Sequence, residues 1–347
     1  MKIRKNVCLV GLVAVSITAC TPQKTIKKTE TVKRVQKNNS DTSDNKKTNS
    51  ADVSYKKEYM LHIGGFDFYK KNIADITKND NTESYGSIVS AKPSGYMVTK
   101  NYFPSVAQNF RQRFLILHYT ALNNDKSIST LTEKGVSSHY IVGDPNDREI
   151  YQIVDENKRA YHAGISYWRG FENLNDSSIG IEIVNPGYVL YEGRKQFFNY
   201  PEWQYRKIAA LAKDIINRYN LSPVNVLGHS DIAPTRKHDP GPKFPWKRLY
   251  NEYKIGMWYD EATKRNLLNQ IDAESFYAQS TTAPFILKIQ SMLGEFGYKI
   301  ENSGELDENT TKTITAFQYH FRPENCSGIM DRETYAILQA LLLKYPR

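Results

Sequence analysis

Two histidines and one aspartate stand where a metal ion could be bound. His229 follows the apolar run 224–227, and Asp239 lies ten residues further on, in a proline-containing loop. Far upstream, His118 also ends an apolar run, 114–117. If these runs are strands that lie side by side, the two imidazoles come together and the loop carboxylate supplies a third ligand. Three protein ligands with one open position are the composition of a catalytic zinc site, not of a closed structural one.

A glutamate inside a third apolar run is a further candidate. Glu182 lies in the run 179–184 and is flanked by Ile181 and Ile183. Because side chains alternate along a strand, Glu182 points away from these neighbours, toward either water or a cleft. Gly180 shares this face of the strand, and we expect its missing side chain to leave room for a ligand.

The loop that carries Asp239 also contains a lysine and another histidine. If the loop is locally extended, Lys237 and Asp239 face one side and His238 faces the other. We therefore expect Lys237 to lie near the metal ligands, and we do not expect His238 to be one of them.

Strands and helices that could hold these side chains are visible as hydrophobic patterns. A helix is expected from Pro201 to Tyr219, where apolar residues recur at helical spacing. Strands mixed with long helical segments indicate a layered α/β or α+β fold. The expected strands are the apolar runs 114–117, 138–142, 149–154, 179–184 and 224–227.

The N-terminal residues 1–20 are typical of a lipoprotein signal peptide. A basic start precedes a short apolar stretch, which ends in Ile-Thr-Ala and Cys20. We expect Cys20 to be the lipidation site and the new N-terminus. Residues 21–54 are polar and rich in lysine, so they cannot bury enough apolar surface to fold and are expected to form a flexible basic linker.

The net charge of the chain and its cysteines narrow the possible functions. The net charge is +10, but the leader contributes three positive charges and residues 21–50 a surplus of five. Most of the basicity therefore lies outside any folded domain, and we expect no nucleic-acid partner. Only Cys326 lies beyond the leader, so a disulfide framework within the folded part is excluded.

The C-terminal part has a helical pattern of its own. Residues 261–282 are polar and are expected to connect two domains, with partial helix. Apolar residues then recur at helical spacing in three segments, so residues 283–347 are expected to form a small three-helix domain. The expected helices run from about 284 to 296, from 310 to 321 and from 332 to 343.

Four segments of the chain resemble one enzyme family. They are residues 117–121 (Leu-His-Tyr-Thr-Ala), 161–164 (Tyr-His-Ala-Gly), 178–182 (Ser-Ile-Gly-Ile-Glu) and the proline-rich stretch 228–242. Together they resemble the zinc-dependent N-acetylmuramoyl-L-alanine amidases of the amidase-2 family, which are related to the peptidoglycan recognition proteins. Within that family the chain is most similar to the lipid-anchored AmiD type. The resemblance implies an α/β catalytic domain over 55–260, with a mixed central sheet flanked by helices.

The same resemblance implies roles for individual residues. The Zn²⁺ ligands would be His118, His229 and Asp239. Glu182 corresponds to the catalytic acid and base of the family, and Lys237 to the group that stabilises charge. We expect His162, Tyr119 and Thr120 to contact the substrate, and His139 to line the groove or to be structural.

The C-terminal helices resemble the three-helix peptidoglycan-binding domain. A Gly-x-hydrophobic-Asp turn precedes two of the expected helices, at Gly304 and at Gly328, with Phe317-Gln318 between them. This domain is expected to add only residence on the polymer. Its removal from about residue 283 would then leave the cleavage of small soluble fragments largely intact, unless the module also packs against the catalytic domain and covers apolar surface.

The function that the resemblance implies is hydrolysis of the amide between N-acetylmuramic acid and L-alanine, in the turnover or recycling of cell wall. The partners would be peptidoglycan or muropeptides and, through the lipid anchor, the periplasmic face of the outer membrane. Two alternatives stay open: a non-catalytic recognition protein of the same fold, and a zinc peptidase acting on wall peptides. The complete ligand set with Glu182 and Lys237 favours an enzyme, and the lack of a His-Glu-x-x-His run argues against the common zinc peptidases.

Overall fold

The computed structural model describes residues 58–63, 66–71, 107 and 109–347. The signal peptide, Cys20 and the linker predicted at 21–54 lie outside the described residues. At the start of the described part, strands β1 (Glu58–Ile63) and β2 (Phe66–Lys71) pair antiparallel.

A five-stranded sheet forms the centre of the domain, in the order β11-β3-β8-β4-β5. Its first four strands run parallel and β5 pairs antiparallel with β4, so the expected mixed sheet is confirmed. Residues on both faces of its central strands are buried, as is usual for a parallel sheet covered by helices. The strands are β3 (Phe114–Tyr119), β4 (Tyr140–Val142), β5 (Tyr151–Gln152), β8 (Ser178–Ile183) and β11 (Val226–Gly228).

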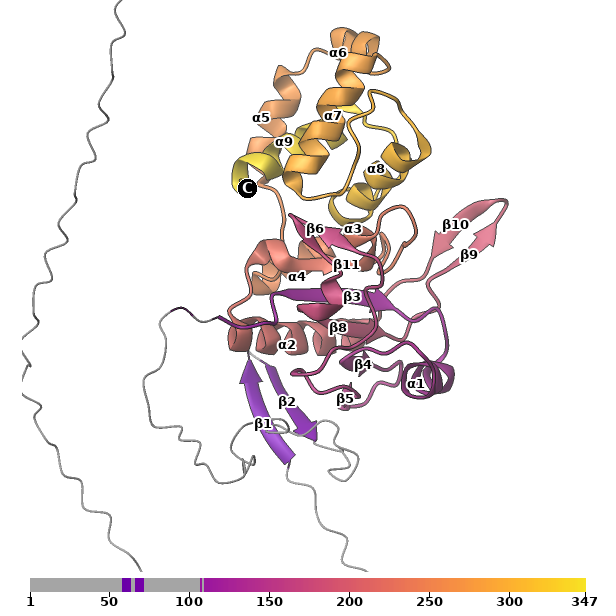
Figure 1. Cartoon of the computed structure of the whole chain (residues 1–347), viewed down its shortest axis with the longest axis vertical. Helices are drawn as coiled ribbons and strands as arrows, with labels where there is room; N and C mark the ends of the chain where they lie inside the picture. Colours follow the sequence, from indigo (N-terminus) through magenta and orange to yellow (C-terminus); the bar gives the residue numbers. More distant parts are fainter. Residues whose placement is uncertain (1–57, 64–65, 72–106, 108) are drawn as a thin grey trace, which may run out of the picture. The chain divides into compact units, whose positions relative to one another are not determined.

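Helix α2 (Glu202–Tyr219) lies along the sheet and contacts β3 and β4 (Figure 1). Its apolar residues Ile208, Leu211 and Ile215 are buried against the sheet. Pro201 precedes its first turn, and Asn220 ends it in the left-handed conformation. The helix expected from the hydrophobic spacing is therefore confirmed.

Some elements differ from their expected form. The run 149–154 pairs only at Tyr151–Gln152, because β5 is an edge strand that follows an exposed turn. Helix α1 (Asn124–Glu133) was not expected, since only Ser127 and Leu131 of it are buried. The side chain of Asn123 begins it by accepting from the N–H of Lys126.

Short elements complete this domain. They are the hairpin β6 (Tyr167–Trp168) and β7 (Phe171–Glu172), the 3-10 turn η3 (Leu174–Asp176), the hairpin β9 (Tyr188–Tyr191) and β10 (Arg194–Phe197), the 3-10 turn η4 (Pro223–Asn225), and helices α3 (His229–Ile232) and α4 (Trp246–Tyr253).

The C-terminal part contains the three expected helices, α7 (Ala283–Phe296), α8 (Glu308–Phe321) and α9 (Arg332–Lys344). The segment 261–282 is more than the connection we expected, because it forms helices α5 (Glu261–Gln270) and α6 (Ala273–Gln279). Asp260 and Asp272 cap these helices, which explains why polar sequence is helical here.

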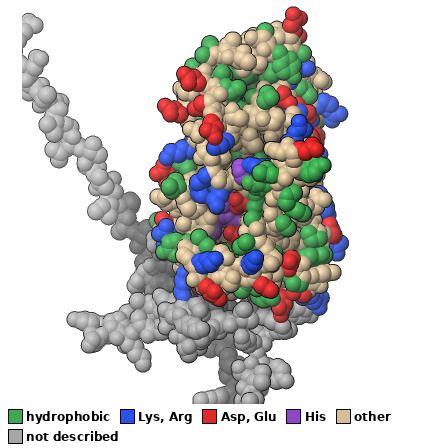
Figure 2. All heavy atoms as spheres, turned by 90° about the vertical axis from the view of Figure 1, so that its right-hand side faces the viewer, with side chains coloured by type: hydrophobic (Ala, Val, Ile, Leu, Met, Phe, Trp, Pro, Cys, Tyr) green, Lys and Arg blue, Asp and Glu red, His purple; other side chains and the backbone are tan. Residues whose placement is uncertain are grey.

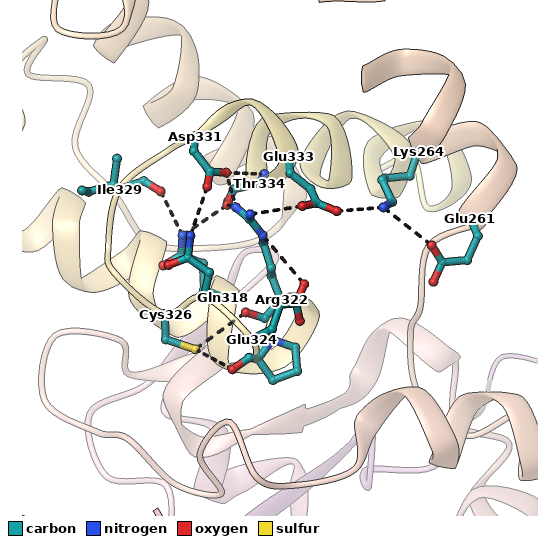
Figure 3. Close-up of polar contacts among 12 residues, drawn as sticks. Glu261, Lys264, Gln318, Arg322, Glu324, Cys326, Ile329, Asp331, Glu333 and Thr334 are labelled. Carbon is teal, nitrogen blue, oxygen red and sulfur yellow. Dashed lines mark hydrogen bonds and ion pairs between the residues drawn. The ribbon is translucent and has the colours of Figure 1, made fainter. Parts of the chain in front are cut away.

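Polar contacts tie α5 to the other C-terminal helices. Arg322, at the end of α8, pairs with Asp331 and with Glu333 of α9 (Figure 3). Glu333 in turn pairs with Lys264 of α5 at 2.8 Å. Arg332 also donates to the carbonyl of Ile271 at 2.7 Å. Helix α5 is therefore part of the C-terminal domain.

The C-terminal helices and the sheet share one hydrophobic core. The ring of Trp168 lies 5.7 Å from that of Phe296 and 5.2 Å from that of Tyr298, between ring centroids. The Arg169 guanidinium donates to the carbonyls of Phe296 and Tyr345. The C-terminal helices therefore pack against the domain that contains the central sheet.

Two further findings concern the described part of the chain. None of its helices is long and apolar enough to cross a membrane. Its Cys326 is a free thiol, as the cysteine count predicted.

Candidate metal and catalytic site

Strand register brings the two predicted histidine ligands together. Strands β3 and β11 are neighbours in the sheet, and Leu117 pairs with Gly228. His118 follows Leu117 on β3, and His229 follows Gly228 as the first residue of α3, so their side chains meet at the carboxyl edge of the sheet. The two Nδ1 atoms lie 2.9 Å apart.

Asp239 completes this cluster from the loop. Its Oδ2 lies 3.0 Å from Nδ1 of His118 and 2.9 Å from Nδ1 of His229, and all three side chains are buried. Its backbone carbonyl accepts from the N–H of Ser230 at 2.8 Å, which holds the loop against α3. The three candidate ligand atoms lie within 4.8 Å of one another. The structure thus assembles the predicted ligand set.

The charges of these groups follow from burial and from one another. Burial and the neighbouring His229 lower the pKa of His118 to about 4, so this imidazole is neutral near pH 7. Burial alone would raise the pKa of Asp239, but His229 and His118 outweigh it and hold that pKa well below its ordinary value. Asp239 is therefore ionised, as a ligand carboxylate must be.

Hydrogen-bond roles show that this cluster fits a cation. Nε2 of His229 lies 3.1 Å from the carbonyl oxygen of Ala163, which can only accept, so Nε2 carries the hydrogen. In the tautomer with hydrogen on Nε2 alone, Nδ1 is a lone pair that faces the Asp239 carboxylate. Two acceptors at 2.9 Å repel each other unless a cation lies between them. Two imidazoles and one carboxylate are a ligand set that suits zinc.

Glu182 lies directly beside the cluster, because His118 and Glu182 are register partners on the parallel strands β3 and β8. Its Oε2 is buried and has no hydrogen-bond partner within the described part of the chain. Burial, followed by the charge of Asp239, raises the pKa of Glu182 to about 8, whereas Lys237 acts in the opposite direction. Of the two surroundings expected for Glu182, water or a cleft, the structure shows a cleft.

The residues around Asp239 alternate as the sequence predicted. Lys237 lines the same cavity as Asp239. His238 points elsewhere, with its Nε2 2.7 Å from Nζ of Lys195. Its ring lies near those of Tyr188 and Tyr319, away from the ligand atoms.

A cavity of about 200 Å³ opens beside the cluster. Figure 2 looks onto this side of the molecule, where histidine side chains and acidic groups show in a hollow bordered by basic side chains. Tyr119, Thr120 and His162, predicted to contact substrate, all line the cavity, together with Glu182, His229, Lys237 and Asp239. The exposed ring of Tyr161 also stands at its border.

The amino-acid sequence matches the model of a known family over residues 108–242, described as N-acetylmuramoyl-L-alanine amidase. It is also 43% identical over 240 residues to N-acetylmuramoyl-L-alanine amidase AmiD of Escherichia coli K12, an alignment that covers 68% of this chain and 84% of AmiD. The chain belongs to the N-acetylmuramoyl-L-alanine amidase family. It is therefore an amidase that hydrolyses the bond between N-acetylmuramic acid and L-alanine.

Solved structures show the same relationship for this amidase. A complex of E. coli AmiD with anhydro-N-acetylmuramic acid-L-Ala-D-gamma-Glu-L-Lys superposes with a TM-score of 0.64 at 39% identity, covering 73% of this chain and 97% of AmiD. AmpDh3 of Pseudomonas aeruginosa, in complex with anhydromuramic pentapeptide, gives 0.65 at 40% identity and covers 73% and 99%. These matches confirm the predicted fold.

The C-terminal domain matches a separate family model. Residues 282–338 of this amidase match a second family model, described as a peptidoglycan binding domain. The prediction drawn from the turns at Gly304 and Gly328 is confirmed at this level. Both turns have positive φ, and the Asp307 and Asp331 that follow them cap α8 and α9.

The structure corrects one expectation about the amidase site. Gly180 does not leave room for a ligand, because the space beside it is filled by the ring of His162. A Cβ on Gly180 would lie 2.6 Å from that ring. His139 is structural, since its Nδ1 accepts from the N–H of Gly180 and its Nε2 donates to the carbonyl of Lys158.

Several residues that support the site were not found from the sequence. They act through side-chain contacts that hydrophobic spacing does not predict. Two signals were available: Ser178 shares a strand face with Gly180 and Glu182, and Ser178, Asp231 and Arg236 lie in the segments that resemble known amidases. The residues are Asn175, Ser178, Asp231 and Arg236, which contact the backbone or side chains of the segments around His162 and His229.

Proposed function

We propose that this chain hydrolyses the amide of muropeptides with Zn²⁺ held by His118, His229 and Asp239. The observation that carries this proposal is the convergence of three metal-binding acceptors beside the unpartnered Oε2 of Glu182. When bound, zinc lowers the pKa of a water molecule to about 7 and polarises a carbonyl group.

Glu182 is the proposed general acid and base. Its Oε2 would take the proton of the attacking water and pass it to the nitrogen of L-alanine as that amine leaves. A pKa raised to about 8 suits this exchange, because an acid–base catalyst works best when its pKa is near the operating pH. The lack of another hydrogen-bond partner leaves Oε2 free to bind that water.

Lys237 is proposed to stabilise negative charge on the carbonyl oxygen. Its side chain lines the cavity that also contains Glu182 and Asp239. A single donor of this kind contributes about 2.7–4 kcal/mol to a transition state. Tyr119, Thr120 and His162 are proposed to contact the substrate from the walls of the same cavity.

Muropeptides with an anhydromuramoyl end are the substrates to test first. The solved complexes of AmiD and AmpDh3 both contain a ligand of this kind. We also propose that the C-terminal domain binds the wall polymer, in line with its family match. Cleavage would then serve the turnover or recycling of cell wall.

The proposed location of the enzyme is the periplasmic face of the outer membrane. The support is the sequence alone: a signal peptide at 1–20, Cys20 at its end and the polar linker that follows. Lipid chains on Cys20 would hold the enzyme at the membrane, while the linker would let it reach the wall.

Mass analysis of reaction products tests the catalytic proposal. An anhydromuramoyl tetrapeptide should yield the free sugar acid and an intact peptide with L-alanine at its N-terminus. A zinc peptidase would instead shorten the peptide. Activity should disappear after chelation and return with added zinc, and the His118→Ala variant should show no such return. Full activity of the metal-free enzyme would overturn the proposed zinc chemistry.

A further inference from the structure

His162 lies between the proposed ligand His118 and strand β8. Its ring occupies the space beside Gly180, where a Cβ would meet it at 2.6 Å. Its Nδ1 lies 2.9 Å from Nε2 of His118, and its Nε2 lies 3.1 Å from Oγ of Ser178. All three side chains are buried. The contacts form a row that ends at the metal-binding cluster.

The hydroxyl of Ser178 determines which atoms donate in this series of hydrogen bonds. Oγ of Ser178 lies 2.6 Å from the carbonyl oxygen of Leu174, which has no hydrogen to give. The single hydroxyl hydrogen of Ser178 is therefore used in that bond. The contact with His162 then requires that Nε2 of His162 carries a hydrogen and donates it to Ser178.

The remaining hydrogens follow one after another. The ring of His162 is buried, which favours the neutral imidazole with a single N–H. With that hydrogen on Nε2, the Nδ1 of His162 is an acceptor. Nε2 of His118 must then donate to it. Nδ1 of His118 is left with a free lone pair that faces Asp239 and His229.

The segment that contains His162 also holds the ring of His229. The side-chain oxygen of Asn175 accepts from the backbone N–H groups of His162 and Ala163, at 3.0 and 2.7 Å. The carbonyl of Ala163 accepts from Nε2 of His229. The two buried residues 162–163 therefore contact Nε2 of His118 and Nε2 of His229.

We infer that His162, held by Ser178, is a positioning residue that keeps His118 in the tautomer with hydrogen on Nε2 and a lone pair on Nδ1 for the metal. This inference rests on the proposed zinc site. It gives His162 a role in addition to the predicted contact with substrate. Loss of such a partner of a ligand imidazole lowers metal affinity about 10–100-fold in other metal sites.

The tautomer can be observed directly by nitrogen NMR of the full chain. Long-range ¹H–¹⁵N correlation separates the two neutral forms of each histidine, and it can be recorded before and after zinc is added. We expect hydrogen on Nε2 of His118 in both states. Hydrogen on Nδ1 of His118 in the metal-free wild type would overturn the inference.

Matched variants test the consequence for metal binding. His162→Leu removes the acceptor for His118 and should lower zinc affinity about 10–100-fold, measured by competition with a chelator. His162→Asn places an amide oxygen near the position of Nδ1 and should restore most of that affinity. Ser178→Ala should lower affinity in the same direction, but less, because His162 keeps its own place.

His139→Leu is the control for these variants. His139 is also buried and bonded at both nitrogens, but to the backbone of Gly180 and Lys158 rather than to a ligand. It should lower the melting temperature without changing zinc affinity of the folded protein. Wild-type zinc affinity in a folded His162→Leu variant would refute the positioning role. Correct tautomers with tight zinc binding but no cleavage would support that role and would instead reject the proposed reaction.

Discussion

Asp231 and His320 are joined across the boundary between the amidase domain and the C-terminal helices. Oδ2 of Asp231 lies 2.7 Å from Nδ1 of His320, and both side chains are fully buried. Asp231 also accepts from the hydroxyl of Tyr298 and from the backbone N–H of Gly228. It belongs to the same short helix, α3, as the proposed ligand His229. The C-terminal domain therefore helps to hold the segment that presents this proposed metal ligand.

Removal of residues 283–347 should damage the active site as well as wall binding. The deletion would expose core residues such as Trp168 and leave Asp231 without Tyr298 and His320. We expect a lower melting temperature and slower cleavage of a small soluble muropeptide, not only slower digestion of sacculi. Unchanged cleavage of the soluble fragment by a stable truncated chain would contradict this.

A single substitution tests the contact between Asp231 and His320 without removing the C-terminal domain. His320→Leu removes the partner of Asp231 and should cost about 1.5–3 kcal/mol of folding free energy, the usual contribution of a hydrogen bond to a charged group. Urea unfolding measures this. The control is His238→Leu, whose half-buried ring contacts Lys195 at the surface and which should change stability less.

Zinc should stabilise the folded chain, because the three proposed ligands come together only in the folded state. We expect the melting temperature to rise with zinc, and this rise to vanish in His118→Ala and His229→Ala. Stabilisation grows with the logarithm of the ratio of zinc concentration to dissociation constant. His238→Ala is the matched control, since its ring faces away from the cluster and should leave the zinc effect intact.

Glu182→Gln should separate metal binding from turnover. The amide keeps the shape of the side chain but cannot carry the proton, so kcat should fall about 10²–10⁴-fold while zinc affinity stays within a few-fold. Stopped product assays and chelator competition measure the two quantities. Glu192→Gln, at the exposed turn between β9 and β10, should behave as wild type. A kcat near that of wild type would make Glu182 structural.

Cys20→Ser should release the enzyme from membranes. Lipid attachment requires the thiol of Cys20. Fractionation of cells that express the two forms shows the difference, with cleavage by the soluble variant as the control for folding. A variant that stays membrane-bound would assign the anchor to another part of the chain.

Sequence patterns predicted the parts of this molecule that depend on local periodicity. The strand that ends in His118, the strand that carries Glu182 and the helix α2 all follow from hydrophobic spacing, and alternation placed Lys237 and His238 correctly. Their places at the ends of apolar runs, and then the resemblance to known amidases, pointed to His118 and His229 as proposed ligands among seven histidines.

Contacts between segments that are far apart in the sequence could not be predicted from local periodicity. The pairing of Asp231 with His320 joins residues that are 89 positions apart, and neither position has a pattern that identifies its partner. The place of His162 beside Gly180 depends on the path of an irregular loop. Partial helix was expected in residues 261–282, but the bounds of helices α5 and α6 were not predicted, because capping aspartates, not an apolar face, mark where they begin.

The raised pKa of Glu182 predicts how stability depends on pH in the metal-free protein. The ordinary pKa of 4.5 applies to the unfolded chain, and burial, with the charge of Asp239, raises it to about 8 in the folded one. Between these values the folded state holds a proton that the unfolded state has released. Folding is therefore favoured by this group at low pH, and this contribution is lost as the pH rises through the window.

Glu182→Gln removes this titration, so the variant should gain stability relative to wild type as the pH rises from about 5 to 8. The gain should reach up to a few kcal/mol, since one pKa unit corresponds to about 1.4 kcal/mol. Urea unfolding with a chelator at pH 5, 7 and 9 measures it, and other groups cancel because both proteins contain them. Added zinc should reduce the gain, because a nearby cation favours the ionised carboxylate. A difference between the two proteins that stays constant with pH would show that Glu182 is ionised throughout the range.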